Sequence, residues 1–87
     1  MNFEINENEI DLYMDTQRSE LGGYVQFEVE NKTLYLNHTV VLEKYRGLGF
    51  GKLLMEETIR YAEENGLKIK PICSYAIVYF EKNHISF

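Results

Sequence analysis

Three parts of this sequence carry groups that could take part in chemistry. His38, one of two histidines, has an imidazole that titrates near neutral pH and could accept a proton. The turn Arg46-Gly47-Leu48-Gly49-Phe50-Gly51-Lys52 combines three glycines with two cations. Cys73, the only cysteine, offers a thiol that could act as a nucleophile or carry a proton. Whether these groups can act depends on the elements that position them.

The glycine turn is suited to bind an anion. Glycines let the backbone turn tightly without a Cβ in the way, so several N–H groups can point into one concavity. A helical pattern follows, and a helix N-terminus favours anions; each hydrogen bond to a charged oxygen contributes on the order of 1.5 to 3 kcal/mol. Arg46 and Lys52 add positive charge at the rim. The turn therefore predicts a phosphate site, although a glycine-rich connector without a ligand has the same pattern.

Two well-known phosphate motifs are excluded by spacing. A P-loop has four residues between its glycines, but three residues separate Gly47 from Gly51, and Leu53 stands where the hydroxyl residue should be. A dinucleotide fingerprint fails because its third glycine is not at the required offset, and the chain is too short for a doubly wound sheet. No metal site is predicted, because no cluster of His, Cys, Asp and Glu has ligand spacing.

The first half of the chain is predicted to form a meander of antiparallel strands. The expected strands are residues 3–5, 10–14, 24–30 and 33–42. Polar turn residues fill positions 15–23, with Gly22-Gly23 as the break. Asn31-Lys32 supplies a tight hairpin, because Asn tolerates left-handed backbone. The fourth strand is almost continuously apolar, so it is expected to lie centrally with both faces covered.

The second half changes to a helical period. From Gly49 to Asn65, apolar residues fall on one stripe and charged residues on the other. A short strand is expected from Leu67 to Ile72, where Pro71 removes one ladder hydrogen bond, so pairing should fail near that point. A second helix is expected from Tyr75 to Asn83. The predicted fold is α+β, with two main helices packed on a mostly antiparallel sheet.

Composition agrees with a single small domain spanning residues 1–87. Hydrophobic residues make up 45% and aromatic residues 14%, which argues against disorder. The net charge of −5 argues against binding nucleic acid or an anionic membrane, although positions 44–52 hold three cations and no acid. No apolar run approaches the roughly 18 residues of a membrane span, and the first residues resemble neither a signal nor a transit peptide. We therefore expect a cytoplasmic protein.

The glycine turn resembles that of the GNAT-type N-acetyltransferases. Arg46-x-x-Gly49-x-Gly51, after an apolar strand and at the start of an amphipathic helix, is similar to the Arg/Gln-x-x-Gly-x-Gly/Ala pyrophosphate motif of that family. The blocks His38–Val41, Tyr45–Gly49 and Lys70–Tyr75 resemble, in order and spacing, its very short YjdJ-like subfamily of small predicted acetyltransferases. The match covers about Leu21 to Phe87. It implies the GNAT-like, acyl-CoA N-acyltransferase fold.

The resemblance also implies a site for acetyl-coenzyme A. The pyrophosphate would rest on main-chain amides from Leu48 to Lys52, and the pantetheine arm would lie where the His38 strand and the strand from Leu67 to Ile72 splay apart. The implied cofactor-binding residues are Val40, Val41, Arg46, Gly47, Leu48, Gly49, Phe50, Gly51 and Lys52.

The candidate catalytic residues are Cys73, which the resemblance implies, and His38, whose imidazole suits a general base. Acetyl transfer needs a neutral amine, which is rare at pH 7 for a pKa near 10.4, and a proton for the departing thiolate. Larger family members commonly use a Tyr in the last helix for that proton, but alignment puts Phe80 there and Tyr79 one residue away, a rotation of about 100°. The cysteine of the Pro-x-Cys block is the residue proposed in the short subfamily, and a helix N-terminus favours a thiolate. A buried apolar cysteine and an ordinary strand histidine are the alternatives.

The sequence thus predicts a minimal acetyl-CoA-dependent N-acetyltransferase acting on an unidentified amine, which could be a small molecule or a protein side chain. The acidic surface favours a positively charged amine. The alternatives are a non-catalytic module that binds coenzyme A or acyl-CoA, suggested by Phe80, and a small protein-interaction domain. Both a monomer and a homodimer fit the sequence, because exposed sheet edges allow pairing but no segment identifies an interface.

Overall fold

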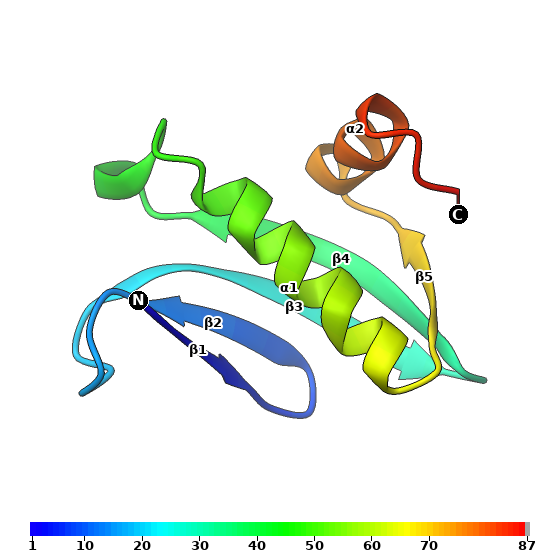
Figure 1. The fold of residues 1–87 in the computed structure, drawn as a ribbon, viewed down its shortest axis with the longest axis horizontal. Coiled ribbons are helices and arrows are strands. Elements are labelled where there is room, and N and C mark those ends of the chain that lie inside the picture. Colours follow the sequence, from blue (N-terminus) through cyan, green and yellow to red (C-terminus); the bar gives the residue numbers. More distant parts are fainter. Residues whose placement is uncertain (87) are drawn as a thin grey trace.

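A five-stranded sheet carries two helices on one of its faces in the computed structural model, which describes residues 1–86 (Figure 1). The elements are β1 (Asn2–Ile5), β2 (Glu9–Tyr13), β3 (Leu21–Glu30), β4 (Thr33–Val41), the short 3-10 helix η1 (Glu43–Tyr45), α1 (Phe50–Glu64), β5 (Lys68–Pro71) and α2 (Ser74–Lys82). The strands lie side by side in chain order; β1 to β4 are antiparallel and β5 is parallel to β4. This is the predicted α+β class with a mostly antiparallel sheet.

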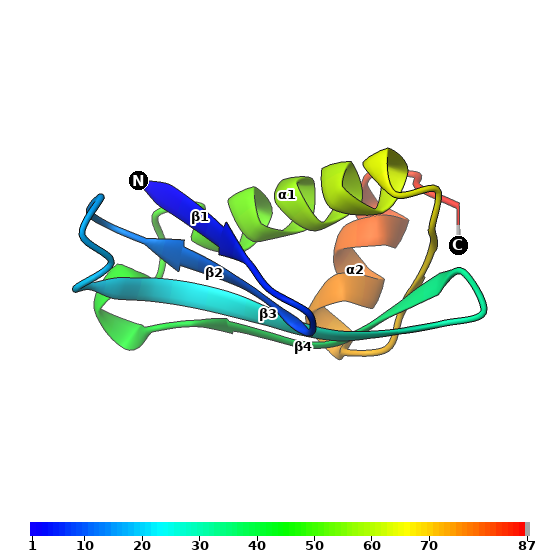
Figure 2. The same cartoon turned by 90° about the horizontal axis from the view of Figure 1, so that it is seen from below.

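The core lies between the sheet and the helices (Figure 2). The apolar residues that β2, β3 and β4 contribute are Ile10, Leu12, Val25, Phe27, Leu34 and Leu36, and those of the helices are Phe50, Leu54, Met55, Ala62, Ala76 and Phe80. The predicted apolar stripe of α1 therefore faces the sheet. Among the described residues no helix combines the length and the apolar character needed to cross a membrane.

The expectation that both faces of β4 are covered is wrong. Both helices pack on the same face of the sheet, so only Leu34 and Leu36 of this strand are fully buried, while Tyr35 is half-buried and His38 is exposed. With only two helices available, one sheet face is left to solvent, as is common for antiparallel sheets. That open face is called the outer face below.

The predicted turn at Gly22-Gly23 is also wrong. Both glycines lie inside β3, where Gly23 pairs with Val41. A Cβ on Gly23 would lie 2.6 Å from the carbonyl oxygen of Val40, so glycine is required by the close approach of the neighbouring strand. The hairpin at Asn31-Lys32 is confirmed, with φ angles of 51° and 61° that match a left-handed two-residue turn.

One acidic side chain is buried in the sheet. Asp11 of β2 is 8% exposed, and its Oδ1 has no hydrogen-bond partner among the described residues. Burial, then contact with Glu9 and the charge of Glu4, raises the pKa of Asp11 to about 7. The folded state therefore holds a proton on this carboxyl more tightly than the unfolded chain does.

This burial predicts a pH-dependent effect of Asp11→Asn. The raised pKa means that the stabilisation from protonated Asp11 is complete below about 3.8 and is lost as the pH rises towards about 7. Since Asn resembles the protonated carboxyl, the variant is expected to be more stable than the parent at pH 8, by roughly 2 to 4 kcal/mol, with the difference shrinking at pH 5.5. Urea unfolding at both pH values measures this, and a difference independent of pH would contradict it.

Candidate functional site

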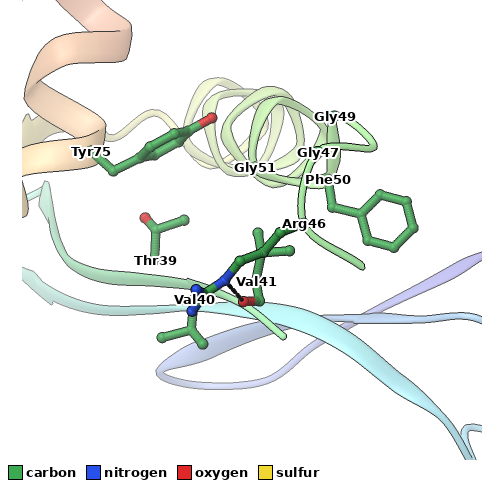
Figure 3. Close-up of a pocket in the computed structure, with 9 residues that line it drawn as sticks. All are labelled: Thr39, Val40, Val41, Arg46, Gly47, Gly49, Phe50, Gly51 and Tyr75. Atoms are coloured by element: carbon green, nitrogen blue, oxygen red, sulfur yellow. Dashed lines mark hydrogen bonds between the residues drawn. The ribbon is translucent and has the colours of Figure 1, made fainter. Parts of the chain in front are cut away.

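A pocket of about 440 Å³ lies where the N-terminal end of α1 meets the second half of β4 and the start of α2 (Figure 3). It is lined by Thr39, Val40, Val41, Arg46, Gly47, Gly49, Phe50, Gly51 and Tyr75. The fold thus gathers the predicted cofactor-binding residues around one cavity, except for Leu48 and Lys52. These two are exposed residues of the same segment that do not line the pocket.

Main-chain amides are available at the mouth of α1. Gly47 and Gly49 both have φ of +83°, a left-handed conformation that favours glycine, and Gly49 is the N-cap of the helix. The amides of Phe50, Gly51 and Lys52 donate to no other described residue, and the first turn contains no acidic side chain. This end of α1 can therefore accept anionic oxygens.

The start of α1 is fixed by an aromatic contact. Phe50 is buried and its ring stacks on Tyr45 of η1, with the ring centroids 5.4 Å apart. In Figure 3 the Phe50 ring points away from Thr39 and Tyr75. The side chain thus anchors the helix end, while the backbone at the same position faces the pocket.

Arg46 is held at the edge of the pocket. Its Nε donates a hydrogen bond to the carbonyl oxygen of Val41 at 3.2 Å (Figure 3). The residue is exposed, and its guanidinium makes no ion pair with another described residue. Its remaining N–H donors are therefore free to bind an anion at the α1 terminus.

Tyr75, which the sequence prediction did not include, closes the pocket on the α2 side. A Cβ on Gly51 would lie 2.5 Å from the Tyr75 hydroxyl oxygen, so the third glycine makes room for this phenol (Figure 3). Burial raises the pKa of Tyr75, which keeps the hydroxyl protonated at neutral pH. A glycine inside a helical pattern, as at Gly51, is the sequence signal for such a close approach.

The strands β4 and β5 part beside the pocket. Their pairing ends at Leu36 with Pro71, as predicted, and the amides of Ile72 and Cys73 both donate to the carbonyl oxygen of Leu36. Beyond Leu36, the β5-side edge of β4 has no strand partner among the described residues. This free edge can offer backbone hydrogen bonds to an extended ligand.

A β-bulge in β4 decides which way its side chains point. Gln26 of β3 pairs with His38 and Phe27 pairs with Leu36, so Asn37 is an extra residue. The inward-facing Val25 pairs with Thr39, which therefore points towards the helices, whereas His38 points to the outer face. Without the extra residue, His38 would share the face of Leu36.

Cys73 and His38 consequently lie on opposite faces of the sheet. Cys73 is the N-cap of α2, is half-buried, and its Sγ lies 3.4 Å from Thr39 Oγ1 at the pocket wall. His38 is exposed and lines a cavity on the outer face. No group of three or more His, Cys, Asp or Glu side chains within residues 1–86 could hold a metal ion.

The two aromatic residues considered for proton donation in the last helix do not line the pocket. Phe80 is 1% exposed in the core. Tyr79 is half-buried, and burial, then the charges of Glu56 and of ionised Tyr75, raises the pKa of its phenol. At the start of α2, by contrast, the phenol of Tyr75 lines the pocket and the thiol of Cys73 contacts Thr39 in its wall.

Comparison with known proteins identifies the family. A family model described as GCN5-related N-acetyl-transferase matches residues 3–86. The sequence matches none of the curated proteins with which it was compared. Assignment to the short YjdJ-like subfamily stays a prediction.

Solved structures agree with this fold. A GCN5-like candidate N-acetyltransferase from Staphylococcus aureus superposes with a TM-score of 0.72 at 29% identity, covering 94% of this chain and 79% of that protein. A candidate acetyl transferase from Pyrococcus furiosus gives a TM-score of 0.65 at 25% identity, covering 94% and 62%. A mutant BH1408 protein from Bacillus halodurans, 20% identical over 94% and 62%, shares the fold with a TM-score of 0.61. The chain thus spans less than two thirds of the length of the proteins from Pyrococcus furiosus and Bacillus halodurans.

Proposed function

Because this chain belongs to the GCN5-related N-acetyltransferase family, we propose that it transfers an acetyl group from acetyl-coenzyme A to an amine. One observation carries the proposal: the free amides at the start of α1 and the unpaired edge of β4 border a single pocket, and the thiol of Cys73 contacts Thr39 in its wall. These features supply, in order, a place for a diphosphate, a place for an extended amide chain, and a reactive group at its end.

Different residues would bind different parts of acetyl-coenzyme A. Amides of Phe50 to Lys52 donate to diphosphate oxygens, and Arg46 adds charge beside them. The edge of β4 from Thr39 to Val41 donates and accepts main-chain hydrogen bonds in the manner of a paired strand. Tyr75 lines the pocket on the α2 side, where its phenol ring offers an apolar contact to the bound chain.

The transfer itself requires a proton at the leaving group. Acetyl-coenzyme A supplies the acetyl group: the amine nitrogen bonds to the carbonyl carbon, the carbon–sulfur bond breaks, and the sulfur keeps the electron pair. In this proposal Cys73 gives its thiol proton to that sulfur, and the contact of 3.4 Å between Thr39 Oγ1 and Cys73 Sγ supports a role for Thr39 in orienting the thiol. The nitrogen loses one proton when the amide forms, and that proton returns to the Cys73 thiolate, so the thiol is regenerated and no further reactant is needed.

Binding calorimetry tests the proposal. Acetyl-coenzyme A is expected to bind one to one, and S-acetyl-pantetheine, which lacks the diphosphate, is expected to bind at least about tenfold more weakly because it leaves the α1 amides unused. Release of free thiol in the presence of an amine panel then measures turnover. Absence of binding at millimolar acetyl-coenzyme A, or equal affinity for the two ligands, would contradict the proposal.

A further inference from the structure

The outer face of the sheet contains two adjoining cavities. One, of about 310 Å³, is lined by residues that include Glu9, Glu28 and His38. The other, of about 470 Å³, is lined by residues that include Glu28, Glu30 and Ile72. Glu28 and Asn37 line both, so the cavities meet at the β4 bulge. Together they are called the outer cavities, and their volumes suit a small molecule.

The outer cavities carry negative charge that the described protein does not neutralise. Neither is lined by Lys or Arg, and Glu9, Glu28 and Glu30 form no ion pair with a described residue. Neutral amides hold two of the carboxylates: Gln26 Nε2 donates to Glu9 at 3.1 Å, and Asn37 Nδ2 donates to Glu28 at 3.2 Å. These amides orient the two carboxylates without pairing them with a positive charge, as a site for a cation requires.

A buried acid, Asp11, lies beside Glu9. Asp11 follows the same outward alternation along β2, since its neighbours Ile10 and Leu12 are core residues. It is 8% exposed, its Oδ1 has no hydrogen-bond partner among the described residues, and its carboxyl contacts Glu9. Asp11 itself lines neither outer cavity, but a cation held by the neighbouring Glu9 would favour its ionised form.

The outer cavities and the pocket lie on opposite faces of the sheet, and both border the point where β4 and β5 part. On β4, His38 lines an outer cavity and the next residue, Thr39, lines the pocket. After β5, Ile72 lines an outer cavity and the next residue, Cys73, contacts Thr39. Two pairs of consecutive residues thus border both sites, one site on each face of the sheet.

From this arrangement we propose that the outer cavities bind the acetyl acceptor, and that the acceptor is a small amine with a second positive charge, such as a linear diamine or polyamine. The inference rests on the proposed function. The reacting nitrogen must lose its proton, so it cannot be the cation that the carboxylates hold; a second ammonium group fills that role. His38, at the border, accepts the proton that the reacting ammonium loses. The neutral nitrogen then bonds to the carbonyl carbon, and the leaving sulfur is protonated from Cys73.

Steady-state kinetics with matched amines tests the inference. Putrescine and spermidine are expected to have kcat/KM at least about tenfold above butylamine, which has the same reacting end and no second charge. Glu28→Gln is expected to reduce this preference about tenfold by raising KM for the diamine, and added salt should reduce it further. Glu63→Gln, on the exposed side of α1, is the charge-matched control and should leave the preference unchanged.

The outcomes separate this inference from the proposed function. Acetyl-coenzyme A affinity of Glu28→Gln, measured by calorimetry, should equal that of the parent, because Glu28 faces away from the pocket. If butylamine and putrescine react equally well, or Glu28→Gln keeps the full preference, the acceptor inference is overturned while acetyl transfer stands. A lysine-containing peptide preferred over every small amine would also overturn it, in favour of a protein acceptor. Absence of acetyl-coenzyme A binding instead overturns the function itself.

Discussion

Gly49→Glu is expected to weaken acetyl-coenzyme A binding by at least about a hundredfold. Gly49 caps α1 with φ of +83°, and a Cβ there would meet no atom within 4 Å, so a side chain would extend into open space at the helix mouth. A carboxylate in that place would occupy the amides of the first turn and repel the diphosphate. Loss of two charged hydrogen bonds of about 1.5 to 3 kcal/mol each accounts for the magnitude. Calorimetry of parent and variant measures it.

Gly66→Glu is the matched control for that experiment. Gly66 also has a left-handed φ, of +66°, and also has open space around the position of a Cβ, but it follows the opposite end of α1. Both substitutions should cost about 1 to 2 kcal/mol of folding stability from the left-handed backbone. Gly66→Glu should nevertheless bind acetyl-coenzyme A like the parent. Equal affinity of the two variants would show that the mouth of α1 does not hold the diphosphate.

Cys73→Ser is expected to lower kcat by about a hundredfold or more while acetyl-coenzyme A affinity changes little. Serine keeps the size of the side chain and can still pair with the Thr39 hydroxyl, but its hydroxyl is a much poorer proton donor than a thiol. General acid catalysis commonly contributes a factor on the order of 100 to 10,000. Thiol release with putrescine at saturating acetyl-coenzyme A measures kcat, and calorimetry measures affinity.

Two further measurements decide what Cys73 does. Ser74→Ala changes the neighbouring exposed residue and should leave kcat unaltered. Mass spectrometry of the parent incubated with acetyl-coenzyme A alone should find no acetyl group on Cys73. An acetylated Cys73 would instead indicate that the acetyl group passes through a covalent intermediate on the thiol. Full activity of Cys73→Ser would show that the thiol has a structural role and no catalytic one. Binding without turnover in the parent would identify a coenzyme A-binding module.

Features set by neighbours along the chain could be predicted from the sequence. The apolar stripe of α1 and the turn at Asn31-Lys32 depend on residues a few positions apart, and both are observed. The parting of the strands at Pro71 was predictable for the same reason, because proline lacks the N–H that a ladder needs. Most of the pocket lining followed from one contiguous glycine turn.

Features set by contacts between distant residues could not be predicted. Gly23 reads as a turn residue in isolation, and its real constraint is the carbonyl of Val40 on the next strand. Tyr75 enters the pocket because Gly51, on the other helix, leaves room for its hydroxyl. The outward direction of His38 depends on the pairing register of β3 with β4, which periodicity within one strand cannot reveal.

The inserted Asn37 divides β4 into two stretches that follow opposite parity rules. Before it, even-numbered positions such as Leu34 and Leu36 face the helices; after it, odd-numbered positions such as Thr39 do so. An apolar residue introduced at an even-numbered position therefore faces the core before Asn37, but faces solvent after it. When this strand is aligned with other sequences or redesigned, the positions before and after Asn37 have to be assigned to the two sheet faces separately.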